Sequence, residues 1–119
     1  MSGSNEIIFD KARFENKDKM GRDLIFMIRE GLSSNHAEAI LPHRPNLLAV
    51  DPATGFTAFH AAAAVGRQDL FDLFASAVTP PYSQRDNLGR SPSDLAAIVA
   101  RDFELCEHIC EMEAVSLGL

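Results

Sequence analysis

An internal repeat constrains the fold of this chain more than any other feature. Two segments, DPATGFTAFHAAAAVGRQDLFDLFASA at 51–77 and DNLGRSPSDLAAIVARDFELCEHICEM at 86–112, present a similar order of residue types. Three pairs of positions share a separation of 34 residues: Gly55 with Gly89, Thr57 with Ser91, and His60 with Asp94. The apolar segments that follow align with one extra residue. A period of this length is typical of folds in which each repeat is one small supersecondary unit.

Each unit predicts a turn, a short helix, a second turn and a larger helix. The glycine of the first turn adopts a positive φ without steric cost, and the Thr or Ser two residues later suits a helix N-cap. The alanine-rich helix then offers small side chains to a neighbouring helix. A glycine ends this helix in the first unit, and the LFDLF segment at 70–74 supplies the apolar stripe of the next one. We assign structural roles to the following residues: Gly55, Thr57, Gly66, Gly89, Ser91 and Pro92.

The first unit resembles the ankyrin repeat, whose signature D-x-x-G-x-T-P-L-H-x-A-A-x-x-G precedes an apolar second helix. It matches this signature at Gly55, Thr57, Phe59, His60, Ala62, Ala63 and Gly66. Ala58 stands where the family has proline. In the second unit Ser93 and Asp94 replace the usual Leu-His pair, and Ala100 replaces the last glycine. The resemblance implies an all-α ankyrin-repeat solenoid of stacked helix-turn-helix units with short β-hairpin-like turns.

One repeat of this kind cannot bury its own apolar face, so at least three repeats are expected. The stretch before the first unit fits a degenerate repeat, with an apolar-striped helix at 23–30, a stop at Gly31 and a second helix at 36–41. We expect these units: an N-terminal repeat at 21–50, a central repeat at 51–85 and a C-terminal repeat at 86–119, which together form the repeat domain at 21–119. Residues 1–20 are polar with an IIF cluster. They are expected to form a mobile tail, a partner-binding peptide or an extra capping turn.

His60 has two interpretations, as a catalytic or metal-binding residue and as a buried structural residue. In the resembled family the histidine at this position is structural. This implies that His60 hydrogen-bonds backbone and hydroxyl groups that order neighbouring turns. No Ser or Cys nucleophile can be matched with a base from its spacing in the chain. We therefore predict no catalytic residue, no enzymatic activity and no cofactor.

Cys106, His108 and Cys110 suggest a metal site, but their spacing argues against one. On a helix the two cysteines share a face while His108 points away, and neighbouring turns give poor geometry for a disulfide. A metal site would need further ligands from elsewhere, such as His36 or His43. The sequence predicts two reduced thiols in or near the core and no metal. A metal-binding or enzymatic protein that uses the cysteine pair or the histidine of the central unit is the alternative.

The charge balance and the N-terminal sequence restrict the expected partners and location. The 17 acidic and 11 basic residues give a formal net charge of -6, which repels phosphate backbones and anionic membranes. We therefore expect neither nucleic-acid nor membrane binding. No signal pattern or membrane-spanning segment occurs, so an intracellular, cytoplasmic location is expected, with the nucleus also open. The acidic residues of the last helix predict a solvated outer face or, alternatively, a patch for a basic partner.

The resemblance also implies which positions point into the concave groove, namely the hairpin tips and the exposed face of each first helix. In this chain they are Ala53, Thr54, Phe56, Ala64, Val65, Asn87, Leu88, Arg90, Ile98 and Val99. Most of them are apolar, and an exposed apolar strip usually marks a binding surface. We predict a non-enzymatic module that binds a partner protein, as an adaptor or an inhibitor, with Phe56, Leu88 and Arg90 as its anchors. The alternative is a self-associating protein, a homodimer, in which a second copy or the N-terminal segment covers the strip.

Overall fold

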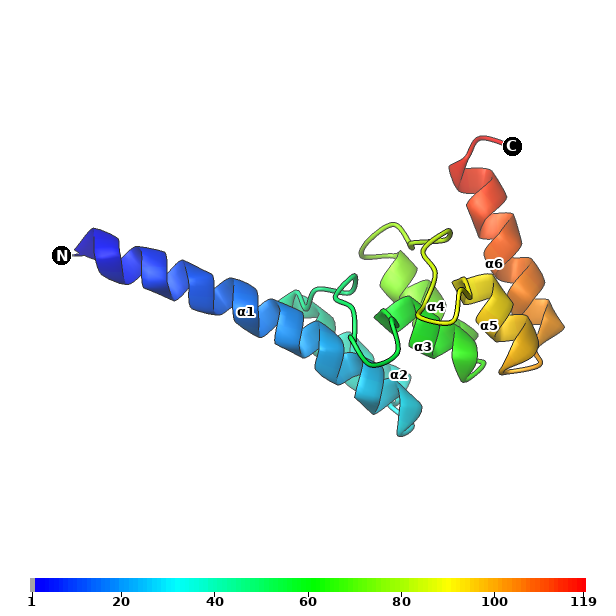
Figure 1. Cartoon of the computed structure of the whole chain (residues 1–119), viewed down its shortest axis with the longest axis horizontal. Coiled ribbons are helices and arrows are strands. Elements are labelled where there is room, and N and C mark those ends of the chain that lie inside the picture. The colour runs from blue at the N-terminus through cyan, green and yellow to red at the C-terminus, as the bar shows by residue number, and fades with distance from the viewer. Residues whose placement is uncertain (1) are drawn as a thin grey trace.

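The computed structural model describes the backbone of residues 2–119 and the side chains of residues 16–119. Over the described backbone the chain forms six α-helices, one short 3-10 helix and no strand (Figure 1). The elements are α1 (Ser2–Arg29), α2 (Ser34–Ile40), the 3-10 helix η1 (Leu41–His43), α3 (Ala58–Ala64), α4 (Gln68–Ala75), α5 (Pro92–Ile98) and α6 (Phe103–Ser116). The predicted all-α class is confirmed. The IIF cluster at 7–9 lies outside the described side chains.

The helices repeat with the spacing that the sequence indicates. α3 and α5 begin 34 residues apart, and α4 and α6 begin 35 residues apart, so the extra residue lies where the alignment placed it. Thr57 caps α3 by accepting from the His60 N–H, and Ser91 caps α5 by accepting from the Asp94 N–H. In both helices the side chain of the third residue accepts in return from the N-cap N–H, which completes a capping box. The same local chemistry therefore starts the first helix of each unit.

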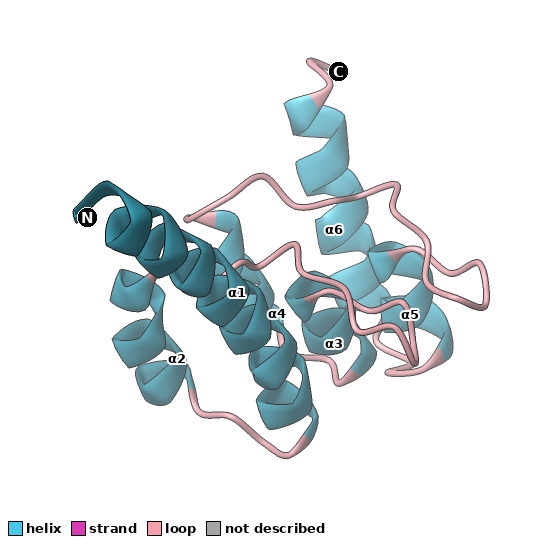
Figure 2. Cartoon of the chain, turned by 60° about the vertical axis from the view of Figure 1, so that its left-hand side comes forward, coloured by secondary structure: helices cyan, strands magenta, loops and turns pink. Residues whose placement is uncertain are grey.

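The helices lie side by side in two rows (Figures 1 and 2). In one row α1 packs against α3, and α3 packs against α5. In the other row α2 packs against α4. Contacts between α3 and α4 and between α5 and α6 join the rows, and His108 of α6 lies 2.7 Å from Asp72 of α4, measured from Nε2 to Oδ1.

In the core, α3 has neighbours on three sides, because it contacts α1, α4 and α5. Phe59 is fully buried and meets the rings of Phe71 and Phe74 edge to face, with centroid distances of 5.3 Å and 6.1 Å. The alanines of the AAAA run are buried at 61–63. Because their side chains are small, α1 and α5 can both pack closely against this short helix. The alanine run is therefore a packing surface.

α1 continues without a break through residue 20, where the sequence placed a domain boundary. The loop after η1 crosses this part of the helix, and the Asn46 N–H donates to the Lys17 carbonyl at 2.9 Å. Gly21 allows the crossing, because a Cβ at this position would clash with the carbonyl oxygen of Asn46. The Asn46 side-chain amide also donates to the Asp18 carboxylate at 2.8 Å. Residues 17–21 are thus attached to the folded body.

Candidate functional site

The first tip loop (residues 51–57) precedes α3 and is closed by its own hydrogen bonds. The Asp51 N–H donates to the Phe56 carbonyl at 2.9 Å, and the Gly55 N–H donates to the Asp51 carbonyl at 2.7 Å. The Asp51 carboxylate also accepts from the Thr54 hydroxyl at 3.0 Å. Gly55 has a φ of 76°, which a residue with a side chain rarely adopts. The loop therefore has one tightly specified conformation.

The second tip loop (residues 86–91) precedes α5 and is built around a buried carboxylate. The Asp86 N–H donates to the Arg90 carbonyl at 2.9 Å. The Asp86 carboxylate accepts from the N–H groups of Leu88 and Arg90 and from the Arg90 Nε, at 2.9, 2.8 and 2.8 Å. Burial opposes ionisation of Asp86, but the hydrogen bonds from Arg90 and Leu88 outweigh it and lower the pKa of the carboxyl below its ordinary value. Asp86 is therefore ionised and fully satisfied.

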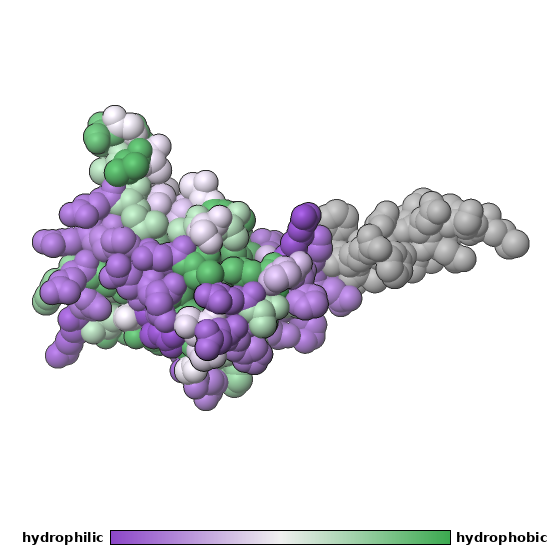
Figure 3. Space-filling view, turned by 180° about the vertical axis from the view of Figure 1, so that it is seen from behind, coloured by the Kyte–Doolittle hydropathy of each residue, from purple (hydrophilic) through white to green (hydrophobic). Residues whose placement is uncertain are grey.

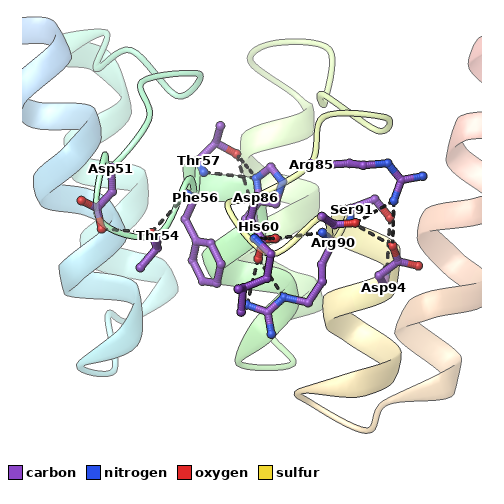
Figure 4. A network of polar contacts seen from close by, with 12 residues as sticks. Asp51, Thr54, Phe56, Thr57, His60, Arg85, Asp86, Arg90, Ser91 and Asp94 are labelled. Carbon is purple, nitrogen blue, oxygen red and sulfur yellow. Dashed lines mark hydrogen bonds and ion pairs between the residues drawn. The ribbon is translucent and has the colours of Figure 1, made fainter.

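The two tip loops are bonded to each other. The Asn87 N–H donates to the Thr54 carbonyl at 3.0 Å, and the Asn87 side-chain amide donates to the Pro52 carbonyl at 2.9 Å. The close fit depends on Gly55, since a Cβ there would lie 2.6 Å from the Asn87 nitrogen. Figure 4 shows Asp51 and Thr54 of the first loop and Asp86 and Arg90 of the second, in front of the row of helices. The tips of successive units thus form one continuous surface.

His60 supports this surface from inside the protein. It is fully buried, and its Nδ1 accepts from the Thr57 N–H at 3.1 Å, so its Nε2 carries the proton and donates to the Gln84 carbonyl at 2.9 Å. Burial lowers the pKa of His60 below its ordinary value, although the Gln84 carbonyl and the Asp86 charge act in the opposite direction. Both ring nitrogens are engaged in hydrogen bonds. His60 therefore joins the start of α3 to the segment around Gln84.

A groove of about 280 Å³ lies between α1 and the two tip loops, and we call it the tip groove. Its lining consists of Arg29, Ala53, Thr54, Phe56, Asn87, Leu88 and Arg90. All of these except Arg29 are among the positions that the sequence analysis assigned to partner binding. Leu88 is the large apolar residue of the lining that is exposed, with 76% of its surface accessible.

The prediction that Phe56 belongs to an exposed strip is wrong. Only 7% of its surface is accessible. Its ring stacks on the ring of His60 with a centroid distance of 5.9 Å, and the Arg29 guanidinium lies 5.9 Å from the Phe56 centroid. The ring is buried because α1 packs beside α3 and covers it, a contact that the repeat pattern alone does not indicate. Phe56 therefore forms part of the floor of the tip groove.

The other four predicted positions lie at the opposite ends of the short helices, outside the groove lining. Ala64 is half-buried and packs against the core. Val65 follows α3 and is exposed, and Ile98 and Val99 at the end of α5 are exposed as well. The predicted strip is therefore divided into the tip groove and a separate exposed apolar set.

Two residues of α1 were not predicted from the sequence. Arg29 lines the tip groove, and Phe26, which is outside the groove lining, is 66% exposed. Together with Arg22 they have the spacing of one side of a helix. A helical-wheel projection could have revealed them, because the buried stripe of Leu24 and Ile28 leaves Phe26 on another face.

The cysteines and His108 do not converge. Cys106 is half-buried, and burial raises the pKa of its thiol. Cys110 is exposed, so the prediction that both thiols lie in or near the core is wrong for Cys110. His108 instead lies against Asp72. Among the described side chains no group of three or more His, Cys, Asp or Glu residues has an arrangement that could hold a metal ion.

A second cavity, of about 520 Å³, lies between α4, the loop that follows it and α6. Its wall is largely apolar and includes Pro80, Tyr82 and Met112, with His108 and Glu111 also in the lining. The end of α6 projects beside it and carries exposed apolar residues, which are green in the view from behind (Figure 3). No position predicted from sequence lies in this cavity.

No protein-family model matches the sequence, and no curated protein matches it significantly. Within residues 2–119, no helix combines the length and apolar content needed to cross a membrane. The tip groove is the feature on which the sequence analysis and the geometry converge.

Proposed function

We propose that this chain is a small ankyrin-repeat protein that acts as a non-enzymatic binding module for a partner protein. Three helix pairs, α1 with α2, α3 with α4 and α5 with α6, correspond to the three expected repeats. The matching caps and the regular spacing of the last two pairs support this assignment. So does the arrangement of first helices in one row, with α1, α3 and α5 in sequence.

The observation that carries the binding proposal is the tip groove. Successive tip loops are joined through Asn87, and they hold Leu88 exposed above a floor that includes Phe56. A surface that is ordered before binding loses little conformational entropy when a partner arrives. An exposed apolar side chain beside a groove is also a typical binding hot spot. We propose that the partner binds here, and that the chain acts as an adaptor or an inhibitor by covering a surface of that partner.

The experiment that tests the site is a comparison of two matched variants. Leu88 and Val115 are equally exposed, at 76%, but Val115 lies on α6 away from the groove lining. Leu88→Glu should remove the main partner recovered by affinity capture with quantitative mass spectrometry, and Val115→Glu should retain it. Circular dichroism should give the same helical signal for both. Equal recovery with the two variants would contradict the proposed site.

Self-association is the second candidate, favoured by the exposed apolar set of Val65, Ile98 and Val99. Sedimentation equilibrium distinguishes it from partner binding. A dimer in the wild type that dissociates in an Ile98→Glu, Val99→Glu double variant would support self-association through this set. A monomer over the whole concentration range would exclude it.

A further inference from the structure

Two arginines line the tip groove, Arg29 and Arg90, and they differ in whether a carboxylate is paired with the guanidinium. Arg90 places its Nε and Nη2 against the Asp86 carboxylate, both at 2.8 Å. The Asp86 side chain is completely buried, whereas the Arg90 side chain retains 27% of its exposure. This pair is neutral overall, and its anion is turned away from solvent.

Arg29 has no such partner. Among the described side chains no carboxylate lies within ion-pair distance of its guanidinium. The guanidinium lies over the Phe56 ring at 5.9 Å from the centroid, and this attraction restricts where the group can move. Arg29 therefore contributes an uncompensated positive charge that is held at the wall of the groove.

The carboxylate of Asp51 is the other acidic group of the tip loops, and it is engaged within its own loop. It accepts from the Thr54 hydroxyl and from the Ala53 N–H. These donors are neutral, so Asp51 keeps its negative charge, but it lies outside the groove lining, whose charged residues are Arg29 and Arg90. Because Asp86 is buried against Arg90, the lining presents a net positive charge in a chain with a net charge of -6. An acidic ligand is repelled by most of this molecule and attracted by this surface, so the charge distribution favours one docking position.

Two exposed apolar side chains accompany these charges, Leu88 in the groove lining and Phe26 outside it on α1. Leu88 is exposed on the second tip loop, and Phe26 is exposed on α1 one turn before Arg29. The volume of about 280 Å³ is slightly below the range of about 300–1,000 Å³ that is usual for small-molecule sites. A groove of this size suits one or two side chains of a peptide segment.

We infer that the tip groove recognises an extended acidic segment of the partner protein, in which Asp or Glu side chains alternate with large apolar ones. A carboxylate lies between the guanidinium groups of Arg29 and Arg90, and an apolar side chain covers Leu88. The occupant is a carboxylate and not a phosphate, because Arg90 already holds the Asp86 carboxylate and one unpaired guanidinium matches a single negative charge better than the roughly two charges of a phosphate. This inference rests on the proposed function and specifies the chemistry of the partner.

The test is selection from a random peptide display library on the folded wild-type chain. Asp or Glu residues next to Leu, Ile, Val or Phe should be enriched. A synthetic peptide with the selected sequence should bind roughly tenfold more weakly to Arg29→Gln, because a charge-assisted hydrogen bond is lost. Gln68→Glu is the control, since it changes the net charge by the same amount at an exposed position on α4. It should bind the peptide as the wild type does, and Arg29→Lys should retain most of the affinity.

Two further outcomes separate this inference from the function on which it rests. In the first outcome, the selected peptides lose binding to Leu88→Glu, but they are basic or uncharged, or they bind Arg29→Gln as tightly as wild type. The groove is then a binding site, and the acidic specificity is wrong. In the second outcome, the selected peptides bind Leu88→Glu and Arg29→Gln as tightly as wild type, and the proposed site is wrong as well. Binding that requires a phosphorylated residue would also overturn the inference. A charge-swapped pair, Arg29→Glu with a Lys-substituted peptide, should recover binding that Arg29→Glu alone abolishes.

Discussion

The backbone N–H of Asn87 donates a hydrogen bond to the carbonyl of Thr54 across 3.0 Å. These residues occupy equivalent regions of successive units, so the bond joins one tip loop to the next. The side-chain amide of Asn87 adds a second bond, to the Pro52 carbonyl at 2.9 Å. The shape of the tip groove is consequently set by contacts between repeats as well as by each loop alone.

The first prediction concerns the contact between the loops. Gly55 and Gly89 have nearly equal φ values, 76° and 79°, so alanine at either position introduces a backbone strain of about 1–2 kcal/mol. At Gly55 the new Cβ would also lie 2.6 Å from the Asn87 nitrogen, whereas at Gly89 no atom beyond the neighbouring residues lies within 4 Å. Gly55→Ala should therefore lower the free energy of unfolding by about 1 kcal/mol or more beyond the loss in Gly89→Ala. Equal losses in urea denaturation would argue against the contact.

The second prediction is that Phe56, in the floor of the groove, contributes more to the free energy of unfolding than Leu88, which is exposed in the lining. Phe56 is buried and Leu88 is exposed. Phe56→Ala should lower the free energy of unfolding by about 3 kcal/mol, because it removes a packed ring. Leu88→Ala should change it by no more than about 0.5 kcal/mol. Chemical denaturation of both variants measures this, and a larger loss in Leu88→Ala would reverse the assigned roles.

The third prediction concerns pH. The pKa of His60 is lower in the folded chain than its ordinary value of about 6.5. As the pH falls below about 6.5, the unfolded chain binds this proton first, so acidification favours unfolding. The stabilisation from neutral His60 is complete above that pH and is lost below it. Between about pH 7.5 and about pH 5, wild type should lose more stability than His60→Gln. The measurement is the free energy of unfolding of both proteins as a function of pH. If the two proteins lose the same amount over this range, His60 does not titrate in this way.

The fourth prediction is that alanine in place of Gly21, inside α1, lowers the stability of the chain. Replacing glycine by alanine inside a helix usually stabilises it by about 1 kcal/mol. Gly21 is inside α1, but a Cβ at this position would clash with the Asn46 carbonyl. Gly21→Ala should therefore lower the midpoint of thermal unfolding, and a rise would mean that the loop does not cross the helix at this point.

The sequence was informative where structure depends on neighbouring residues. The N-caps at Thr57 and Ser91 follow from local chemistry and were predictable, and so was the positive φ of Gly55. The spacing of the helices followed from the alignment of the two units. These features require no knowledge of what packs against them.

The sequence was less informative where structure depends on contacts between distant segments. Phe56 looked exposed because its neighbours in the chain are those of a hairpin tip, but its burial depends on α1. The position of Arg29 in the groove lining also depends on how α1 packs, and it was not predicted for that reason. The length of α1 was not predicted either, because residues 1–20 have no clear apolar stripe, and Gly21 was not recognised as a crossing point.

Where a partner binds is measured most directly by an NMR titration of the ¹⁵N-labelled chain with its captured partner, or with a peptide selected on the chain. Binding at the tip groove should give the largest amide shift changes at Arg29, Thr54, Leu88 and Arg90. Changes confined to the cavity between α4 and α6, at residues 75–82 and 108–116, would contradict it.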